Sequence, residues 1–257
     1  MSYIVSVFNQ KGGVGKTTSV INLSSALGKL GGKILIVDGD PQGNTTSGLG
    51  IEKKSLDISI YDMLINQVKP DDIIIETSAE NVFIIPANVD LAGAEIELTN
   101  AENRETILRQ ALLRLDSKFD YIFIDCPPSL GLLSINALVA SKSVIIPIQC
   151  EYYALEGVSQ LVDTISLVKR SLNPNLEIEG VILSMFDGRT NLSIQVVDEV
   201  KKYFKGKVYT SIIPRNVRLA EAPSYGLSVI DYDSKSKGAE AYMDLGKEFL
   251  ELSREEL

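Results

Sequence analysis

Short apolar runs alternate along the chain with longer segments that have helical periodicity. Most of these runs are apolar at successive positions, which is typical of strands that are covered on both faces of a parallel sheet. Seven runs have the length and the β-branched content of strands. The predicted strands are residues 3–8, 33–38, 82–87, 120–125, 143–149, 178–186 and 207–213.

The segments between these runs repeat their apolar residues with the period of a helix. Helices are predicted over about residues 16–30, 100–116, 130–141, 153–172, 191–205 and 237–253. This alternation favours right-handed crossovers and an α/β fold, a doubly wound, mostly parallel sheet flanked by helices. No internal repeat, low-complexity tract or Pro/Gly-rich linker interrupts the sequence. We therefore expect residues 1–257 to form a single domain.

The composition is that of a globular protein with a substantial core. The 257 residues are 45% hydrophobic and 23% charged. The longest apolar stretches, such as residues 34–37, have the length of a strand and not of a membrane span. The first residues, MSYIVSVFNQ, lack the basic region and cleavage site of a signal peptide. A cytoplasmic location is the expectation.

Cysteine and histidine usage narrows the chemistry. Cys126 and Cys150 lie far apart without C-x-x-C spacing, so we expect buried thiols and neither a disulfide nor a metal site. The chain contains no histidine, which excludes His-based triads, His-metal centres and imidazole general bases.

Charge is unevenly distributed along the chain. The net charge is −9, but residues 185–225 contain seven Lys and Arg against four Asp and Glu, a net charge of +3 that leaves −12 elsewhere. Such a region is either a solvated helix face or an anion-binding surface, and charge alone favours the solvated face.

The segment NQKGGVGKTT, residues 9–18, approaches the phosphate-loop pattern G-x-x-x-x-G-K-[ST]. Lys16 and Thr17 close the motif, but Gln10 replaces its first glycine and is followed by a second lysine, Lys11. Glycine-rich turns also join strands to helices for packing reasons alone. Here the GKTT sequence between a predicted strand and a predicted helix favours phosphate binding.

Each part of the loop has an expected task. The glycines let backbone N–H groups approach phosphate oxygens, the lysine reaches the β- and γ-phosphates, the first threonine places its hydroxyl on Mg²⁺ and the second donates to the α-phosphate. The residues predicted to bind nucleotide here are Gly12, Gly13, Val14, Gly15, Lys16, Thr17 and Thr18.

Acidic residues follow two of the predicted strands. Asp125 ends the apolar run YIFID, the position of a Walker-B aspartate, and should supply the carboxylate that Mg²⁺ requires. The prolines that follow it suit a switch segment. Asp38 and Asp40 alternate in VDGDPQGN and should have different roles. Asp38 is expected to give local support, whereas Asp40 is better placed to orient an attacking water.

These segments together resemble the deviant-Walker ATPases of the ParA/Soj type, which partition chromosomes and plasmids. The resemblance covers essentially the whole chain and rests on the segments KGGVGKTT, DGDPQGN, DCPPSLG, IPIQCEYYALEG and IPRNVRLAEAPSYG. It implies a P-loop fold, Mg²⁺ and ATP as ligands, and ATP hydrolysis.

The resemblance also implies roles for individual residues. In this family the lysine that matches Lys11 crosses a dimer interface to the partner's ATP, so that ATP holds a sandwich dimer together. Asp40 would polarise the hydrolytic water, and Asp125 would hold Mg²⁺ through a water. The residues implied at the adenine are Pro214, Arg215 and Asn216. The absence of an NKxD motif favours ATP over GTP.

Three kinds of partner follow from the resemblance: a second copy of the chain, non-specific double-stranded DNA and a ParB-type centromere-binding protein that stimulates hydrolysis. Arg189 and Arg218 match the arginines through which short family members bind DNA, so the ATP-bound protein would associate with the nucleoid. The sequence begins two residues before its first predicted strand, so no N-terminal helix-turn-helix is expected. The sequence leaves open a further role in replication initiation.

A MinD-like membrane ATPase is the alternative, and it would need a basic amphipathic C-terminal helix. The stripe of Tyr242, Leu245, Phe249 and Leu252 is accompanied by acidic residues, so it is interpreted as core packing, with no membrane contact. An iron–sulfur carrier is disfavoured because Cys126 lacks a paired exposed cysteine. A kinase is disfavoured because the tyrosines are scattered and no acceptor pocket is evident.

Overall fold

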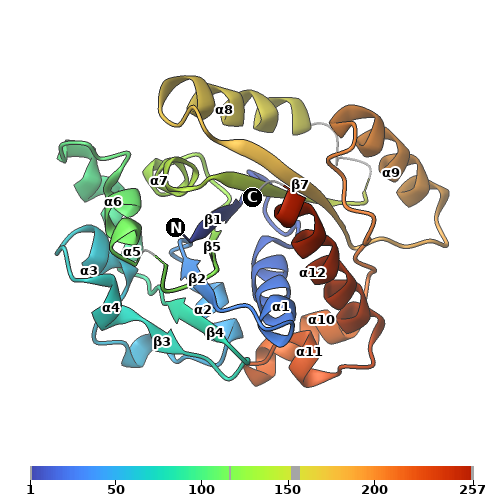
Figure 1. Cartoon of the computed structure of the whole chain (residues 1–257), viewed down its shortest axis with the longest axis horizontal. Coiled ribbons are helices and arrows are strands. Elements are labelled where there is room, and N and C mark those ends of the chain that lie inside the picture. Colours follow the sequence, from blue (N-terminus) through green and yellow to red (C-terminus); the bar gives the residue numbers. More distant parts are fainter. Residues whose placement is uncertain (1, 116, 152–156, 256–257) are drawn as a thin grey trace.

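One seven-stranded sheet organises the computed structural model, which describes residues 2–115, 117–151 and 157–255 (Figure 1). The strand order is β3-β4-β2-β5-β1-β6-β7, and every neighbouring pair is parallel except β3 and β4. The predicted fold class is thus confirmed. The strands are β1 (Tyr3–Val7), β2 (Ile34–Asp38), β3 (Ile75–Glu76), β4 (Val82–Ile85), β5 (Tyr121–Asp125), β6 (Ser143–Gln149) and β7 (Glu177–Ser184).

Helices connect the strands and cover both faces of the sheet. They are α1 (Lys16–Lys29), α2 (Asn44–Gly48), α3 (Ile60–Leu64), α4 (Pro70–Ile73), α5 (Leu91–Glu97), α6 (Ile107–Leu112), α7 (Leu132–Ala140), α8 (Val158–Ser171), α9 (Asn191–Phe204), α10 (Val217–Glu221), α11 (Val229–Tyr232) and α12 (Lys237–Glu255). Figure 1 shows α7 and α8 on one side of the sheet, with α1 and α12 on the other.

Two apolar clusters fill the space between sheet and helices, because successive side chains of a strand point to opposite faces. Leu35 and Val37 of β2 belong to the cluster that includes residues of α7 and α8. Ile34 and Ile36 belong to the cluster that includes residues of α1 and α12. Burial on both faces explains why the strand sequences are continuously apolar.

The C-terminal helix α12 packs closely on α1. A Cβ added at Gly246 would lie 3.0 Å from the Cβ of Ala26, so the glycine permits the close approach. Tyr242, Leu245 and Phe249 are buried, as the predicted stripe requires. Leu252 is 45% exposed, so its assignment to the core was wrong; at this end of α12 Ser253 is buried instead, and its hydroxyl lies 3.2 Å from that of Tyr121.

The prediction of a strand over residues 207–213 was wrong, because the structure has no strand over these described residues. Within this segment the only bridge to β7 in the described part of the chain joins Val208 to Val181, and the next bridge, between Pro214 and Phe186, lies just beyond both the segment and β7. The backbone N–H groups of Thr210 and Ser211 donate to the two carboxylate oxygens of Glu248 on α12 at 2.6 and 2.9 Å. Because these donors are taken by a side chain, no continuous ladder forms between the two bridges.

Other boundaries also differ from the predictions. The predicted helix 100–116 is shorter, with α6 followed by a 3₁₀ turn at Leu113–Leu115; the amide of Asn136 binds the carbonyl of Arg104 and the N–H of Leu108, which holds the preceding segment out of the helix. The beginning of the predicted helix 153–172 falls on residues 152–156, outside the described residues. The two-residue strand β3 and the short helices α2 to α5, α10 and α11 were not predicted.

The sheet brings three loops to one edge. Val7 at the end of β1 and Asp38 at the end of β2 are both the register partners of Asp125 at the end of β5. The glycine-rich loop, the DGDPQGN loop and the DCPP segment therefore begin side by side. This edge is where open parallel sheets bind their ligands.

Candidate active site

The loop between β1 and α1 is fixed by side chains from neighbouring elements. The amide of Asn9 donates to the carbonyl of Pro147 at 2.8 Å, and the amide of Gln10 donates to the hydroxyl of Thr164 at 3.2 Å. At the other end of the loop, the hydroxyl of Ser184 donates to the carbonyl of Val14 at 2.7 Å. Gln10, which replaces the usual glycine, thus ties the loop to α8.

The loop conformation requires glycine at two positions. Gly13 and Gly15 have φ values of 75° and 95°, in the left-handed region that other residues rarely adopt. Gly15 caps α1 without a side-chain hydrogen bond, so Lys16, Thr17 and Thr18 form the first helical turn with N–H groups directed at the loop. A helix start of this kind attracts anions.

Lys16 lies over the loop. Its side chain is buried, with 7% of the residue exposed, and Nζ donates to the carbonyl of Lys11 at 3.3 Å. Burial lowers the pKa of its ammonium, although the carboxylates of Asp125 and Asp40 act in the opposite direction. The ammonium of Lys16, which donates to the Lys11 carbonyl, would be available to bind a phosphate in the loop.

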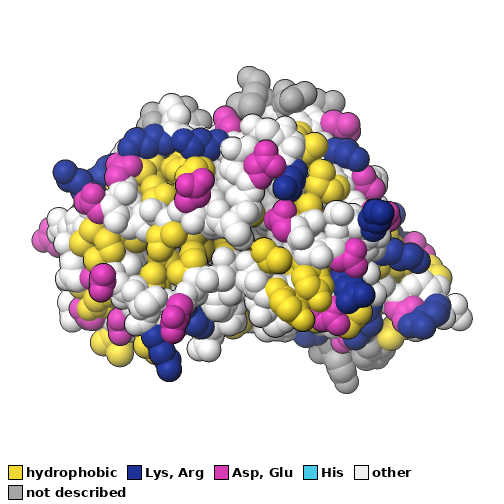
Figure 2. All heavy atoms as spheres, turned by 90° about the horizontal axis from the view of Figure 1, so that it is seen from below, with side chains coloured by type: hydrophobic (Ala, Val, Ile, Leu, Met, Phe, Trp, Pro, Cys, Tyr) yellow, Lys and Arg dark blue, Asp and Glu magenta, His cyan; other side chains and the backbone are white. Residues whose placement is uncertain are grey.

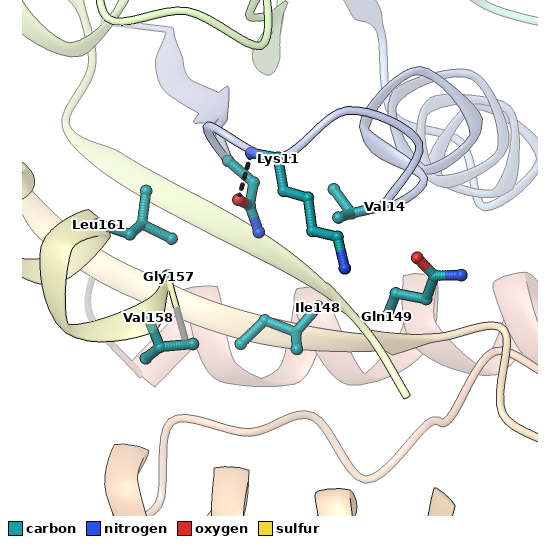
Figure 3. Close-up of a pocket in the computed structure, with 8 residues that line it drawn as sticks. Lys11, Val14, Ile148, Gln149, Gly157, Val158 and Leu161 are labelled. Atoms are coloured by element: carbon teal, nitrogen blue, oxygen red, sulfur yellow. Dashed lines mark hydrogen bonds between the residues drawn. The ribbon is translucent and has the colours of Figure 1, made fainter. Parts of the chain in front are cut away.

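Lys11 is exposed on the same loop. Its backbone N–H donates to the side-chain oxygen of Asn9 at 3.0 Å. Its side chain is exposed and makes no hydrogen bond or ion pair with the described residues. Figure 3 shows this side chain extending toward Val14 and the end of β6, at Ile148 and Gln149. The two lysines of the motif therefore differ: Lys16 is enclosed and Lys11 is presented to the outside.

Asp125, at the sheet edge, accepts hydrogen bonds from two other segments of the site. Its Oδ2 accepts hydrogen bonds from the hydroxyls of Thr17 at 2.7 Å and Thr45 at 2.6 Å. Its Oδ1 is buried without a hydrogen-bond partner in the described part of the chain. Burial raises the pKa of this carboxyl to about 6, against the effect of the two hydroxyl donors.

The DGDPQGN loop is organised by Asp38. Oδ2 of Asp38 accepts from both the N–H and the hydroxyl of Thr46, at 2.8 and 2.6 Å, and Oδ1 accepts from the N–H of Asp40 at 3.3 Å. Burial, followed by the nearby charge of Asp125, raises the pKa of Asp38 to about 7. Asp38 thus holds the loop from beneath, as the expected supporting role requires.

Asp40 is placed at the rim of the site. It is 8% exposed, and its Oδ1 accepts from the N–H of Gln42 at 2.9 Å. The N–H of Gly43 donates to the carbonyl of Asp40 at 2.8 Å and closes a tight turn. Oδ2 of Asp40 accepts no hydrogen bond from the residues that the structure describes, so it can accept one from a water molecule.

The segment predicted to border the base lies beyond β7. Pro214 bridges to Phe186, two residues after the strand end, and the N–H of Arg215 donates to the carbonyl of Phe186 at 2.9 Å. The guanidinium of Arg215 pairs with Glu151 at 2.9 Å, and Asn216 caps α10 through the N–H of Arg218. Because Ser184 of β7 contacts the glycine-rich loop, this segment is on the same side of the molecule as that loop.

The two arginines predicted to meet DNA are exposed but paired with acids. Arg189 forms a two-pronged contact with Asp187, at 2.8 and 2.6 Å, which lowers the pKa of that carboxyl to about 2. Arg218 pairs with Glu221 at 2.7 Å and Asp233 at 3.2 Å. Figure 2 likewise shows positive and negative side chains interspersed on the face it presents, with no broad patch of one sign.

Three contacts of the site were not predicted from the sequence. Thr45 binds Asp125, Thr46 binds Asp38 and Ser184 binds the glycine-rich loop. The adjacent hydroxyls of NTT, directly after DGDPQG, were a signal for the first two. Ser184 had no signal, because it ends a strand distant in sequence.

The two cysteines are not among the residues that form this site. Both are buried free thiols, as predicted, and burial raises the pKa of Cys150 to about 11. Over the described residues, no group of three or more His, Cys, Asp or Glu side chains is arranged to hold a metal ion. No helix in the same part of the chain is long and apolar enough to cross a membrane.

The residues at Asp125 fit Mg²⁺ bound together with a nucleotide. Mg²⁺ commonly uses one or two protein oxygens, several waters and phosphate oxygens, so a cluster of acids is not required. The buried, unpartnered Oδ1 of Asp125 and the adjacent hydroxyl of Thr17 are oxygens of the required kind.

Comparison with known proteins agrees with this geometry. The AAA domain family matches residues 2–178. The sporulation initiation inhibitor protein Soj of Bacillus subtilis is 58% identical over 248 residues, which cover 96% of this chain and 98% of Soj. The chromosome partitioning protein ParA of Myxococcus xanthus is 54% identical, with 96% of this chain and 87% of ParA covered.

A solved structure from Mycobacterium smegmatis, described as cobyrinic acid a,c-diamide synthase with bound ADP and magnesium, superposes with a TM-score of 0.85. It is 39% identical and covers 96% of this chain and 93% of its own. The fold and the glycine-rich site together define the class as a P-loop ATPase of the AAA domain family. Within that class, the full-length identity to Soj and ParA shows that the chain belongs to the ParA/Soj family of chromosome-partitioning ATPases.

Proposed function

We propose that this ATPase partitions DNA through a cycle in which Mg-ATP binding drives sandwich dimerisation and non-specific DNA binding, and hydrolysis reverses both. The observation that carries the proposal is the different presentation of two lysines on one loop. Lys16 is enclosed beside Asp125, whereas Lys11 is exposed on the outside of the same loop.

The first step is binding of the triphosphate in the glycine-rich loop. Phosphate oxygens would take the place of the Lys11 carbonyl as partners of the Lys16 ammonium, and the N–H groups at the start of α1 would donate to them. Gly12, Gly13, Val14, Gly15 and Thr18 supply the remaining contacts of this cradle. Pro214, Arg215 and Asn216 would border the adenine.

Thr17 and Asp125 would hold Mg²⁺, Thr17 directly and Asp125 through a water. When bound, Mg²⁺ neutralises charge on the β- and γ-phosphate oxygens. The hydroxyl proton of Thr17 is already directed at Asp125, so the oxygen lone pairs of Thr17 are free for the ion.

Asp40 would orient the water that attacks the γ-phosphorus. A carboxylate does this by accepting a hydrogen bond from the water, and one oxygen of Asp40 is fixed by Gln42 while the other is available. The bond from the water oxygen to phosphorus forms as the bond to the β-phosphate oxygen breaks, giving ADP and phosphate.

Lys11 would act in trans. On its own subunit the Lys11 side chain is exposed and extends toward Val14 and the end of β6 (Figure 3). Lys16, in contrast, is buried at the glycine-rich loop, so the charge of Lys11 would not be needed for binding ATP there. A second ATP-loaded subunit facing the first would bring each Lys11 to the partner's phosphates, and the two nucleotides would stabilise the dimer. Loss of the γ-phosphate then weakens the dimer.

DNA binding would use Arg189 and Arg218 on the outside of the dimer. The arginines are exposed and their acidic partners are half-buried, and ion pairs at a protein surface contribute little stability, so phosphates of DNA would replace the acids at small cost. Contacts of this kind read no base sequence. The protein would then be nucleoid-associated with ATP bound, and a ParB-type protein would stimulate hydrolysis and release it.

A MinD-like membrane ATPase is the second candidate, because it shares the fold. Its membrane helix has no counterpart in α12, whose apolar residues Tyr242, Leu245 and Phe249 are buried against the body of the protein. Partitioning is favoured for that reason.

The test is co-sedimentation of the protein with arbitrary duplex DNA in ATP or ADP at two salt concentrations. We expect retention in ATP at low salt, loss of retention in ADP and a steep fall with salt. Equal retention in ATP and ADP, or binding to anionic vesicles in place of DNA, would contradict the proposed cycle.

A further inference from the structure

Thr45 lies outside the phosphate-loop motif, yet it contacts the carboxylate at the centre of the site. The residue is completely buried, and its hydroxyl donates to Oδ2 of Asp125 at 2.6 Å. Thr17 donates to the same oxygen at 2.7 Å, which leaves Oδ1 without a hydrogen-bond partner in the described part of the chain. Two donors on one oxygen fix the orientation of the carboxylate.

Thr45 is also rigidly connected to Asp40. The turn after Asp40 is closed by Gly43, and Thr46, the residue that follows Thr45, is held by two hydrogen bonds to Asp38. Thr46 in turn accepts a hydrogen bond from the N–H of Ala87 at 2.9 Å. Residues 40–46 therefore form one braced loop, and the Thr45 hydroxyl joins this loop to the side chain that ends β5.

We propose that Thr45 is a positioning residue for ATP hydrolysis, which couples the water-orienting loop to the metal-holding carboxylate. This inference rests on the proposed function and deepens it. With Oδ2 of Asp125 occupied by the Thr45 hydroxyl, Oδ1 would be the oxygen that remains to hold the metal through a water. The same hydrogen bond fixes the position of Asp40 relative to that carboxylate.

The chemistry of the two threonines differs in a way that assigns them separate tasks. Thr17 follows the phosphate-loop lysine and has lone pairs to give to a metal ion. Thr45 is fully buried, and its single hydroxyl proton is committed to Asp125. Groups that hydrogen-bond a metal-holding carboxylate set its orientation, and their loss typically lowers metal affinity or activity by about 10- to 100-fold.

The experiment compares Thr45→Val, which has nearly the same shape and no hydroxyl, with Thr45→Ser, which keeps the donor. Binding of a fluorescent, non-hydrolysable ATP analogue is titrated with Mg²⁺ and repeated in EDTA, and kcat and KM for ATP are measured at saturating Mg²⁺. Ser25→Ala serves as the control, because it removes a buried hydroxyl that donates to the carbonyl of Ile21 on α1, away from the carboxylate.

We expect Thr45→Val to raise the half-saturating Mg²⁺ concentration by about ten-fold or more and to lower kcat without a matching change in KM. Analogue binding in EDTA should stay at the wild-type level, and Thr45→Ser and Ser25→Ala should resemble wild type in all three measurements. A wild-type Mg²⁺ dependence in Thr45→Val, or equal losses in the Ser and Val variants, would overturn the inference.

Three further results keep the test decisive. If Thr45→Val shows no cooperative unfolding transition, Thr45→Ala replaces it under the same criteria. If wild-type protein binds no analogue in Mg²⁺, the proposed function fails. If wild type binds the analogue in Mg²⁺ and the Thr45 variants show the same Mg²⁺ dependence and kcat as wild type, the proposed function stands and this inference alone fails.

Discussion

Asp40 combines one carboxylate oxygen bonded to its own loop with one that accepts no hydrogen bond from the described residues. Asp40→Ala removes that acceptor without touching the glycine-rich loop. We expect kcat for ATP to fall by about 10²- to 10⁴-fold, because in the proposed cycle Asp40 orients the attacking water and takes no part in ATP binding. ATP binding should persist, and size-exclusion chromatography in ATP should show a trapped dimer that still binds DNA.

The control for this variant is Asp71→Ala, which removes an exposed carboxylate that pairs with Lys118 on the surface. It should hydrolyse ATP at the wild-type rate. A monomeric Asp40→Ala protein in ATP would show that Asp40 acts in dimerisation or binding and not in hydrolysis alone.

Lys11 provides the second prediction at this scale. Lys11→Ala leaves Lys16, the glycines and Asp125 in place, so ATP affinity of the monomer should change little. Dimerisation in ATP should be lost, because in the proposed cycle the ammonium acts only on the partner's phosphates. Analytical ultracentrifugation with a non-hydrolysable analogue measures this, and Lys54→Ala, which removes an exposed lysine outside the glycine-rich loop, is the control. An intact Lys11→Ala dimer would remove the role in trans.

At the residue scale the sequence was most informative where a motif joins neighbouring residues. Lys16, Thr17 and Asp125 could be chosen because glycine spacing and a strand-end aspartate have direct physical meanings. The hydroxyls of NTT were a signal for Thr45, but its partner could not be predicted, since the contact with Asp125 spans 80 residues and depends on how two loops meet. Likewise, pairing of Arg189 with Asp187 depends on the local turn and is not visible in a charge count.

The braced loop after β2 leads to a prediction about elements. Asp38 is completely buried, and its pKa is raised to about 7 from a usual value of 3.8. Between these two values the folded protein holds a proton that the unfolded chain has released. Stability from this group is therefore greatest at low pH and decreases as the pH rises toward 7.

Asp38→Asn should flatten this dependence. In nucleotide-free protein with EDTA, the decrease in unfolding free energy between about pH 4 and 7 should be smaller in the variant than in wild type. Urea unfolding at several pH values measures it. The variant should also lose stability at every pH, because an amide cannot accept from both Thr46 and Asp40 as the carboxylate does. An unchanged slope would show that Asp38 does not titrate in this range.

Elements were predictable where they are long and strongly patterned. The strands β1, β2, β5 and β6 and the helices α1, α9 and α12 lie close to their predicted ranges. The segment 207–213 has a strand-like sequence, but Glu248, which is distant in sequence, captures its N–H groups. Helices of four or five residues, such as α2 and α11, complete too few turns to show a period.

At the scale of the whole molecule, the sequence predicted the class of fold but not the arrangement of its strands. Alternating strands and helices favour a parallel sheet, whereas the order β3-β4-β2-β5-β1-β6-β7 depends on long-range packing. That order determines the position of the glycine-rich loop, because this loop follows β1 and β1 lies between β5 and β6. The glycine-rich loop is thereby placed beside Asp125 on one side and anchored to Pro147 on the other.

The acidic molecule can bind DNA only through a restricted surface, since its net charge is −9. Replacing Arg189 and Arg218 together by Glu should abolish DNA retention while the ATP-dependent dimer remains. Where binding is still measurable, single Arg→Gln variants should each lower the slope of log affinity against log salt by about 0.9 per subunit. Fluorescence anisotropy with labelled duplex DNA at several salt concentrations measures both effects.

The carboxylate beside Arg189 allows a test in the opposite direction, in which a substitution should strengthen DNA binding. Asp187 engages both prongs of the guanidinium, so Asp187→Asn should release Arg189 and strengthen DNA binding with no change in ATP binding. Lys118→Glu, a charge reversal on a surface lysine paired with Asp71, controls for the overall charge. If Lys118→Glu weakens DNA binding as much as the Arg189 and Arg218 replacements do, DNA responds to net charge and not to this surface. If Asp187→Asn weakens it, Arg189 needs its partner to be presented to DNA.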